Sequence, residues 1–151
     1  MIRDEYIVLK ISRISYPKAL MAGNMGRLSV EVSNISSESI QDCRVVLMRS
    51  SQDDFPLNPI EWEHKDHGQP YDKDHWLYYY GIGGIPSLSK VRKAILLDTF
   101  PYAKESVYEI YVGATGQQKF TGWKIRRIQI LQSEYITPPT QESGSIPENI
   151  T

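Results

Sequence analysis

Apolar and polar residues alternate along much of this chain with the two-residue period of β-strands. In the segment RLSVEVSN, Leu28, Val30 and Val32 alternate with serines and a glutamate. A period of two places one set of side chains on a buried face and the other set in solvent, as in half-buried antiparallel strands. The same pattern predicts five further strands, in YIVLKIS (6–12), DCRVVLM (42–48), KVRKAILLD (90–98), VYEIYVGA (107–114) and WKIRRIQIL (123–131).

The last of these segments has an irregular pattern. Its apolar positions change phase, from Trp123 and Ile125 to Ile128 and Ile130. A shift by one residue moves side chains to the other face of a sheet, so we expect a bulge or bend near residues 126–127.

Turn-forming residues separate the predicted strands, at 22–26 (AGNMG), 34–39 (NISSES) and 113–118 (GATGQQ). Helical periodicity is scarce. A short helix could begin at Ser87, because serine is a good N-cap, but the β-rich residues that follow favour a strand. Short strands joined by turns are typical of a β-sandwich, here of about seven to nine strands.

The segment from residue 50 to residue 90 departs from this regular spacing. FPLNPIEWEH and HWLYYYGIGGIP lie within it, and each predicts a short strand flanked by proline or glycine. We interpret residues 50–90 as an elaborated connection inside a single domain over residues 1–134. Long connections of this kind are more often functional than short ones. The composition of residues 135–151 is that of a C-terminal tail.

Composition and charge narrow the class of protein. The 40% hydrophobic and 23% charged residues are typical of a soluble globular protein, and the net charge of −1 argues against nucleic-acid binding. The single cysteine, Cys43, excludes an internal disulfide and fits a reducing compartment. Neither a secretory signal nor a membrane-spanning apolar stretch is visible, so we expect a cytoplasmic protein or the soluble domain of a larger anchored one, without direct membrane insertion.

Two segments carry a family resemblance. GRLSVEVSNISSESIQDCRVVLM resembles the paired strands of CARDB-type domains, in which an apolar strand ends at an asparagine, here Asn34. LLDTFPYAKESVYEIYVGA resembles the corner of fibronectin type III domains. Both likenesses imply an immunoglobulin-like β-sandwich. The second one implies that Tyr108 occupies a tyrosine-corner position, with its hydroxyl bonded to the backbone near the turn.

The segment EHKDHGQPYDKDHW, residues 63–76, holds all three histidines of the chain. A zinc site needs about three convergent His or carboxylate ligands, for which His64, His67 and His75 are the candidates. However, Gly68 and Pro70 disfavour the helix that would bring His64 and His67 together, and a strand would point them to opposite faces. The pattern therefore favours a polar loop, with metal binding or a metal-dependent enzyme as the lesser alternative.

The same region is rich in aromatic residues, which bury a large area with little loss of side-chain entropy when they contact a partner. Strand alternation would send Trp76, Tyr78 and Tyr80 to one face and Leu77 and Tyr79 to the other, and one of these sets would be core. We expect an exposed remainder to form a contact surface. The candidate binding residues are Trp62, Tyr71, His75, Trp76 and Tyr78.

Other motifs carry less chemistry. GIGGIP (81–86) lacks the spacing of a phosphate-binding loop and indicates a turn or bulge. Cys43 lies among apolar residues and is a poor nucleophile candidate, and no catalytic residues or cofactors are predicted. We therefore expect a non-catalytic interaction or ligand-binding module, an accessory domain that contacts a protein partner through residues 60–80. A carbohydrate-binding module with exposed aromatics is the first alternative, and self-association is a further one.

Overall fold

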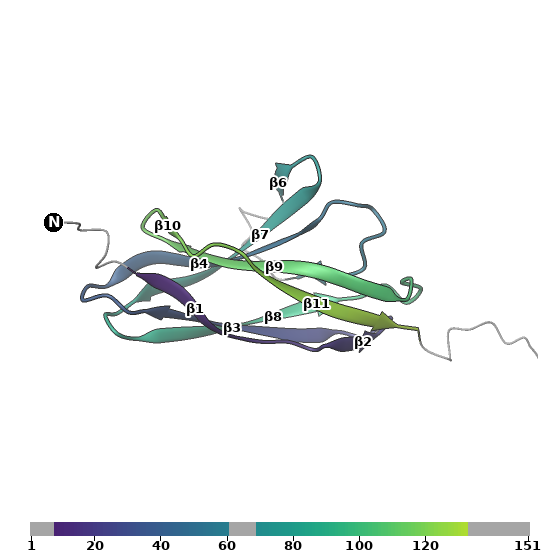
Figure 1. Ribbon diagram of the computed structural model, residues 1–151, viewed down its shortest axis with the longest axis horizontal. Helices are drawn as coiled ribbons and strands as arrows, with labels where there is room; N and C mark the ends of the chain where they lie inside the picture. Colours follow the sequence, from purple (N-terminus) through teal and green to yellow (C-terminus); the bar gives the residue numbers. More distant parts are fainter. Residues whose placement is uncertain (1–7, 61–68, 133–151) are drawn as a thin grey trace, which may run out of the picture.

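The computed structural model describes residues 8–60 and 69–132, which form two β-sheets packed face to face (Figure 1). The described residues contain strands and no helix, as the sequence pattern predicted. Accordingly, this part of the chain contains no helix that is long and apolar enough to cross a membrane.

The sheets differ in size. The small sheet has the strand order β1-β3-β8-β5, and its strands are β1 (Leu9–Ser15), β3 (Gly26–Asn34), β8 (Lys90–Asp98) and β5 (Asn58–Pro59). The large sheet has the order β2-β11-β9-β4-β7-β6, and β10 pairs with β9 outside this path. Its strands are β2 (Ala19–Met21), β11 (Lys124–Leu131), β9 (Ser106–Gly116), β4 (Ile40–Ser50), β7 (His75–Ile85), β6 (Gln69–Asp72) and β10 (Lys119–Phe120).

The N-terminal part of the chain contributes to both sheets. β1 pairs antiparallel with β3 in the small sheet, and β2, which follows after Pro17, pairs with β11 in the large sheet. The β2–β11 pairing is the only parallel one among the described strands. One edge of the large sheet is therefore formed by β2 and β11, which come from the beginning and the end of the described chain.

The core lies between the sheets and contains the alternate residues that the pattern predicted. Leu28, Val30 and Val32 of β3 are fully buried, and so are Ile128 and Ile130 of β11. Burial of each such side chain contributes about 1.5–3 kcal/mol relative to exposure, so these alternating stretches account for much of the stability. Cys43 belongs to this core, as expected for a small apolar residue.

The tyrosine corner implied by the family resemblance is present. The Tyr108 hydroxyl donates a hydrogen bond of 2.8 Å to the carbonyl oxygen of Lys104, four residues upstream and just before β9. Asn34 is completely buried at the end of β3, where its side chain closes the turn into β4. Both residues convert a turn into a fixed connection between strands.

The expected bulge near residues 126–127 is wrong. β11 pairs with β9 in an unbroken register from Lys124 opposite Val112 to Ile130 opposite Ser106. The strand stays regular because its two apolar phases serve two surfaces: Ile128 and Ile130 enter the core, and Ile125 points to the outer face of the large sheet.

Two other expectations change in detail. The turn expected over 113–118 is confined to Gln117 and Gln118, because β9 continues to Gly116. Within residues 50–90, β7 is eleven residues long and not short, and it lies between β4 and β6 in the large sheet. The turn or bulge expected at GIGGIP is a bulge within β7, since the β4–β7 register shifts at the Cys43–Gly83 pair.

Candidate interaction surface

The outer face of the large sheet, which points away from the core, is unusually apolar. Val46 and Met48 alternate along β4 with the core residues Val45 and Leu47, so they lie on the opposite face. Leu77 lies opposite Met48 on β7. All three outward side chains are buried, although the outer face of a sandwich sheet normally carries polar residues. The large sheet therefore has a second, smaller apolar cluster on its outer side.

Aromatic side chains cover this cluster, and we call them together the outer aromatic face. Its five members come from four strands and one loop: Tyr71 of β6, Tyr79 of β7, Tyr111 of β9, Phe120 of β10 and Trp123 before β11. The Phe120 and Trp123 rings lie 4.9 Å apart, and the Tyr71 and Trp123 rings lie 6.4 Å apart. Tyr71 and Phe120 remain 55% and 48% exposed. Large ring surfaces are thus accessible to solvent.

A glycine in β9 lets Phe120 reach this position. A Cβ atom on Gly113 would lie 2.7 Å from the Cε1 atom of Phe120, so any side chain there would displace the ring. The two-residue turn before β10 places both Gln117 and Gln118 at positive φ, the conformation that tight hairpins need. Turn and glycine together fold β10 back onto β9, which sets Phe120 against Trp123.

The outer aromatic face surrounds a shallow pocket of about 200 Å³. Most of its lining residues are aliphatic or aromatic: Val46, Tyr71, Leu77, Tyr79, Thr115, Phe120 and Trp123. The guanidinium of Arg44 lies 5.5 Å from the centre of the Tyr79 ring at the side of this pocket. Such a contact holds a charged group next to the apolar surface.

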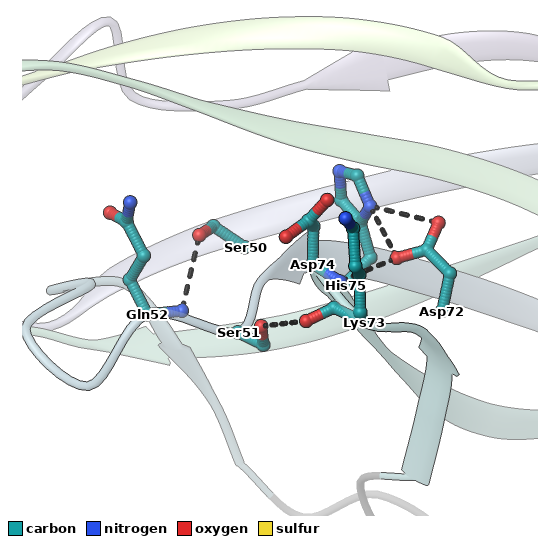
Figure 2. A network of polar contacts seen from close by, with 7 residues as sticks. All are labelled: Ser50, Ser51, Gln52, Asp72, Lys73, Asp74 and His75. Carbon is teal, nitrogen blue, oxygen red and sulfur yellow. Dashed lines mark hydrogen bonds and ion pairs between the residues drawn. The ribbon is translucent and has the colours of Figure 1, made fainter.

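His75 borders the other side of the surface, where the turn between β6 and β7 fixes it (Figure 2). Its Nδ1 atom lies 3.0 Å from one carboxylate oxygen of Asp72, which also accepts a hydrogen bond from the backbone N–H of Asp74. These two contacts, the backbone one first, hold the pKa of Asp72 below its usual value. The imidazole ring packs edge-on against Tyr111, with ring centres 5.8 Å apart.

The structure places the predicted binding residues in different environments. Tyr71 belongs to the outer aromatic face, and His75 lies half-buried beside Tyr111. Trp76 is partly exposed, but it lies on the opposite face of β7 from Leu77. Tyr78 is only 5% exposed and is part of the core, where its hydroxyl accepts a hydrogen bond from Arg49 Nε. Tyr78 therefore presents no ring to a partner.

The histidine hypothesis concerns residues that are mostly outside the described part of the chain. His64 and His67, together with Trp62, fall in the segment 61–68, which the structure does not describe. Within residues 8–60 and 69–132, no three His, Cys, Asp or Glu side chains gather as a metal site would require. Burial raises the pKa of the Cys43 thiol, which agrees with the expectation that it is a poor nucleophile.

Sequence reasoning missed most of the outer aromatic face, although a signal was present. The segments VVLM (45–48) and WLYYY (76–80) are continuous apolar runs that do not alternate. Such runs are typical of strands buried on both faces. Phe120 and Trp123 had no such signal, because their position depends on the fold of the β9–β10 hairpin.

No protein-family model matches the sequence, and no curated protein matches it. Solved structures do match in fold. AvmM, described as catalysing macrocyclization in alchivemycin A biosynthesis, shares 12% identity over 85% of this chain and 90% of its own, with a TM-score of 0.57. A cohesin module from a Clostridium perfringens family 33 glycoside hydrolase shares 8% identity over 84% of this chain and 99% of its own, with a TM-score of 0.54.

The CARDB domain of the PF1109 protein from Pyrococcus furiosus also matches, at 12% identity over 84% of this chain and 90% of its own, with a TM-score of 0.47. At such identities the likeness to these solved structures shows the fold alone. The two packed sheets and the likeness to the cohesin module confirm the fold that the sequence predicted: the chain is an immunoglobulin-like β-sandwich.

Proposed function

We propose that this chain is a non-catalytic interaction module that binds a protein partner through its outer aromatic face. The observation that carries the proposal is the presence of exposed aromatic rings around an apolar pocket, on a sheet face that is polar in most sandwiches. Apolar patches of this kind mark interaction sites on soluble proteins. The segment 60–80 contributes Tyr71 and Tyr79 to this surface and His75 to its border, and Phe120 and Trp123 come from later in the chain.

The size of the pocket supports a protein partner over a small-molecule ligand. Sites for small molecules usually enclose about 300–1,000 Å³. The pocket beside Trp123, at about 200 Å³, is below this range. It suits a single apolar side chain from a partner protein, the arrangement in which one buried anchor supplies much of the binding energy.

The ring geometry argues against the carbohydrate-binding alternative. Stacking on a flat sugar needs two or three rings in nearly the same plane. The Tyr71 and Trp123 rings are inclined by 79°, and the Phe120 and Trp123 rings by 70°. These rings form the walls of a slot and do not form a flat platform.

The role as an accessory domain is part of the same proposal. The cohesin neighbour supports this proposal, because in that protein the fold is a module of a glycoside hydrolase. The buried, unpaired Cys43 fits work in a reducing compartment, either in the cytoplasm or on the cytoplasmic side of an anchored protein.

The proposal is tested by comparing what the native chain and two variants capture from extracts of the source cells. The first variant carries Tyr71→Ala and Phe120→Ala, and the control variant carries Leu88→Ser, which removes an exposed apolar side chain outside this face. Circular dichroism and thermal unfolding verify that both variants are folded.

Loss of a central anchor costs at least about 2 kcal/mol, so the affinity for a captured protein should fall by about 30-fold in the double variant. The Leu88→Ser control should bind like the native chain. A captured protein that binds the double variant and the native chain equally well would contradict the proposal.

A further inference from the structure

A second apolar surface lies at the end of the sandwich where β11 ends, and we call it the C-terminal tip. It consists of side chains from β2, the β2–β3 loop and the β8–β9 loop: Met21, Met25, Phe100, Pro101 and Tyr102. Met25 is 54% exposed and Tyr102 is 76% exposed, and Met21 and Phe100 are also open to solvent. None of these residues belongs to the outer aromatic face, so the proposed partner-binding surface does not account for them.

The two loops of the C-terminal tip are fixed to each other. The Thr99 hydroxyl accepts a hydrogen bond of 2.8 Å from the backbone N–H of Gly23 and donates one of 2.6 Å to the carbonyl of Asn24. A Cβ atom on Gly23, which has a φ of 89°, would lie 3.3 Å from the Cα atom of Pro101. Thr99 itself is buried. The apolar side chains are therefore presented on a preorganised base, which reduces the entropy cost of binding.

The chain leaves the sandwich at this tip. Leu131 is paired with Met21, and its carbonyl accepts a hydrogen bond of 2.7 Å from the N–H of Ala22. The N–H of Gln132 donates to a carboxylate oxygen of Glu105, at 3.4 Å, in the loop that also carries Tyr102. Figure 1 shows β2 and the end of β11 at the same end of the molecule. The end of the described chain is thus hydrogen-bonded both to the residues after β2 and to the β8–β9 loop.

The sequence that follows is suited to this surface. Residues 133–139 read SEYITPP, with Tyr135 and Ile136 three and four residues after Gln132. An extended chain advances about 3.3 Å per residue, so these two side chains reach about 10–13 Å from Gln132.

We propose that residues 133–139 bind the C-terminal tip, with Tyr135 and Ile136 packed against Met25, Phe100 and Tyr102. The occupant is a segment of the same chain, because it is tethered at the tip itself and its effective concentration there is high. The tip is then an intramolecular docking surface, and the outer aromatic face is the one that meets a partner.

Oxidation of methionine tests this proposal in the full chain. Hydrogen peroxide converts an accessible methionine to its sulfoxide, and covered methionines react more slowly. The measurement is the oxidation rate of Met25, followed by peptide mass spectrometry, with the buried Met48 as an internal reference. The test variant carries Tyr135→Ser and Ile136→Ser, and the control carries Ile146→Ser further along the same tail.

If the tail covers the tip, Met25 should oxidise several-fold faster in the double variant than in the native chain, and the Ile146→Ser control should behave like the native chain. Equal Met25 rates in all three proteins would overturn the proposal. Protection of Met25 that disappears on dilution of the native chain would also overturn it, because the occupant would then be a second copy.

Discussion

Substitution of Asn34 should destabilise the sandwich strongly, because this buried side chain connects two turns. Its amide nitrogen donates hydrogen bonds of 2.8 Å to the carbonyls of Glu38 and Ile85. Its amide oxygen accepts a bond of 2.9 Å from the N–H of Ser36. The β3–β4 turn and the end of β7 are thereby held together by one residue.

The cost of Asn34→Ala follows from the groups left without partners. The Ile85 carbonyl and the Ser36 N–H are both buried at these bonds. Each unsatisfied buried group costs about 1–3 kcal/mol, so we expect a loss of about 3 kcal/mol in the free energy of unfolding. For a domain of this size each kilocalorie lowers Tm by about 2–4 °C, which gives a fall of about 10 °C.

Urea and thermal unfolding of purified variants measure this effect. Ser37→Ala, an exposed substitution in the same turn, is the matched control and should change the free energy of unfolding by less than about 0.5 kcal/mol. Asn34→Asp should also destabilise, since it replaces the donor with an oxygen that faces the Ile85 carbonyl. A cost below about 1 kcal/mol for Asn34→Ala would refute the view that this side chain fastens the two turns.

Three further outcomes follow from the geometry. Gly113→Ala should push the Phe120 ring off β9 and expose Trp123, so acrylamide should quench the tryptophan fluorescence more strongly than in the native chain. An unchanged quenching constant would contradict this packing. Tyr108→Phe should lower the free energy of unfolding by about 1 kcal/mol through loss of the bond to Lys104, measured by urea titration. Asp72→Ala should be less stable than the native chain at pH 7. The pKa of Asp72 is lowered in the fold, so its contribution to stability is present above the unfolded pKa and is lost as pH falls through the folded pKa. The urea midpoints of the native chain and of the variant should therefore differ at pH 7 and converge at pH 2.5.

The sandwich could be predicted because its determinants are local. The alternation along β3 and its end at Asn34 depend only on residues within one strand and one turn. The same is true of the tyrosine corner, in which Tyr108 bonds to the backbone four residues upstream. The phase change in β11 was misread for a different reason. A change of phase indicates a bulge only if one face of the strand is buried, and here Ile125 and Ile128 serve opposite faces of a sheet that is apolar on both.

The candidate site could be predicted only in part. Of the residues that the aromatic-rich segment suggests for a contact surface, Tyr71 lies exposed on the outer aromatic face, whereas Tyr78 lies in the core. Which of two alternating sets faces the core depends on register against β4, and a single-sequence pattern does not contain that register. The contact between Phe120 and Trp123 depends on a tight turn and on Gly113, which have meaning only once β9 and β10 are paired.

Stability and recognition are divided between the two layers of the outer surface. The inner layer, Val46, Met48 and Leu77, is already buried in the free chain, so it contributes to folding whether or not a partner is bound. The outer layer includes Tyr71 and Phe120, which keep about half of their surface in solvent, and this is the surface that the proposed partner would cover. Because the rings rest on a packed apolar base and on a glycine that fits Phe120 closely, little side-chain entropy remains to be lost when a partner binds. The cluster of Val46, Met48 and Leu77 takes the place of the polar residues usual on an outer face, and it also forms a rigid base under the exposed rings.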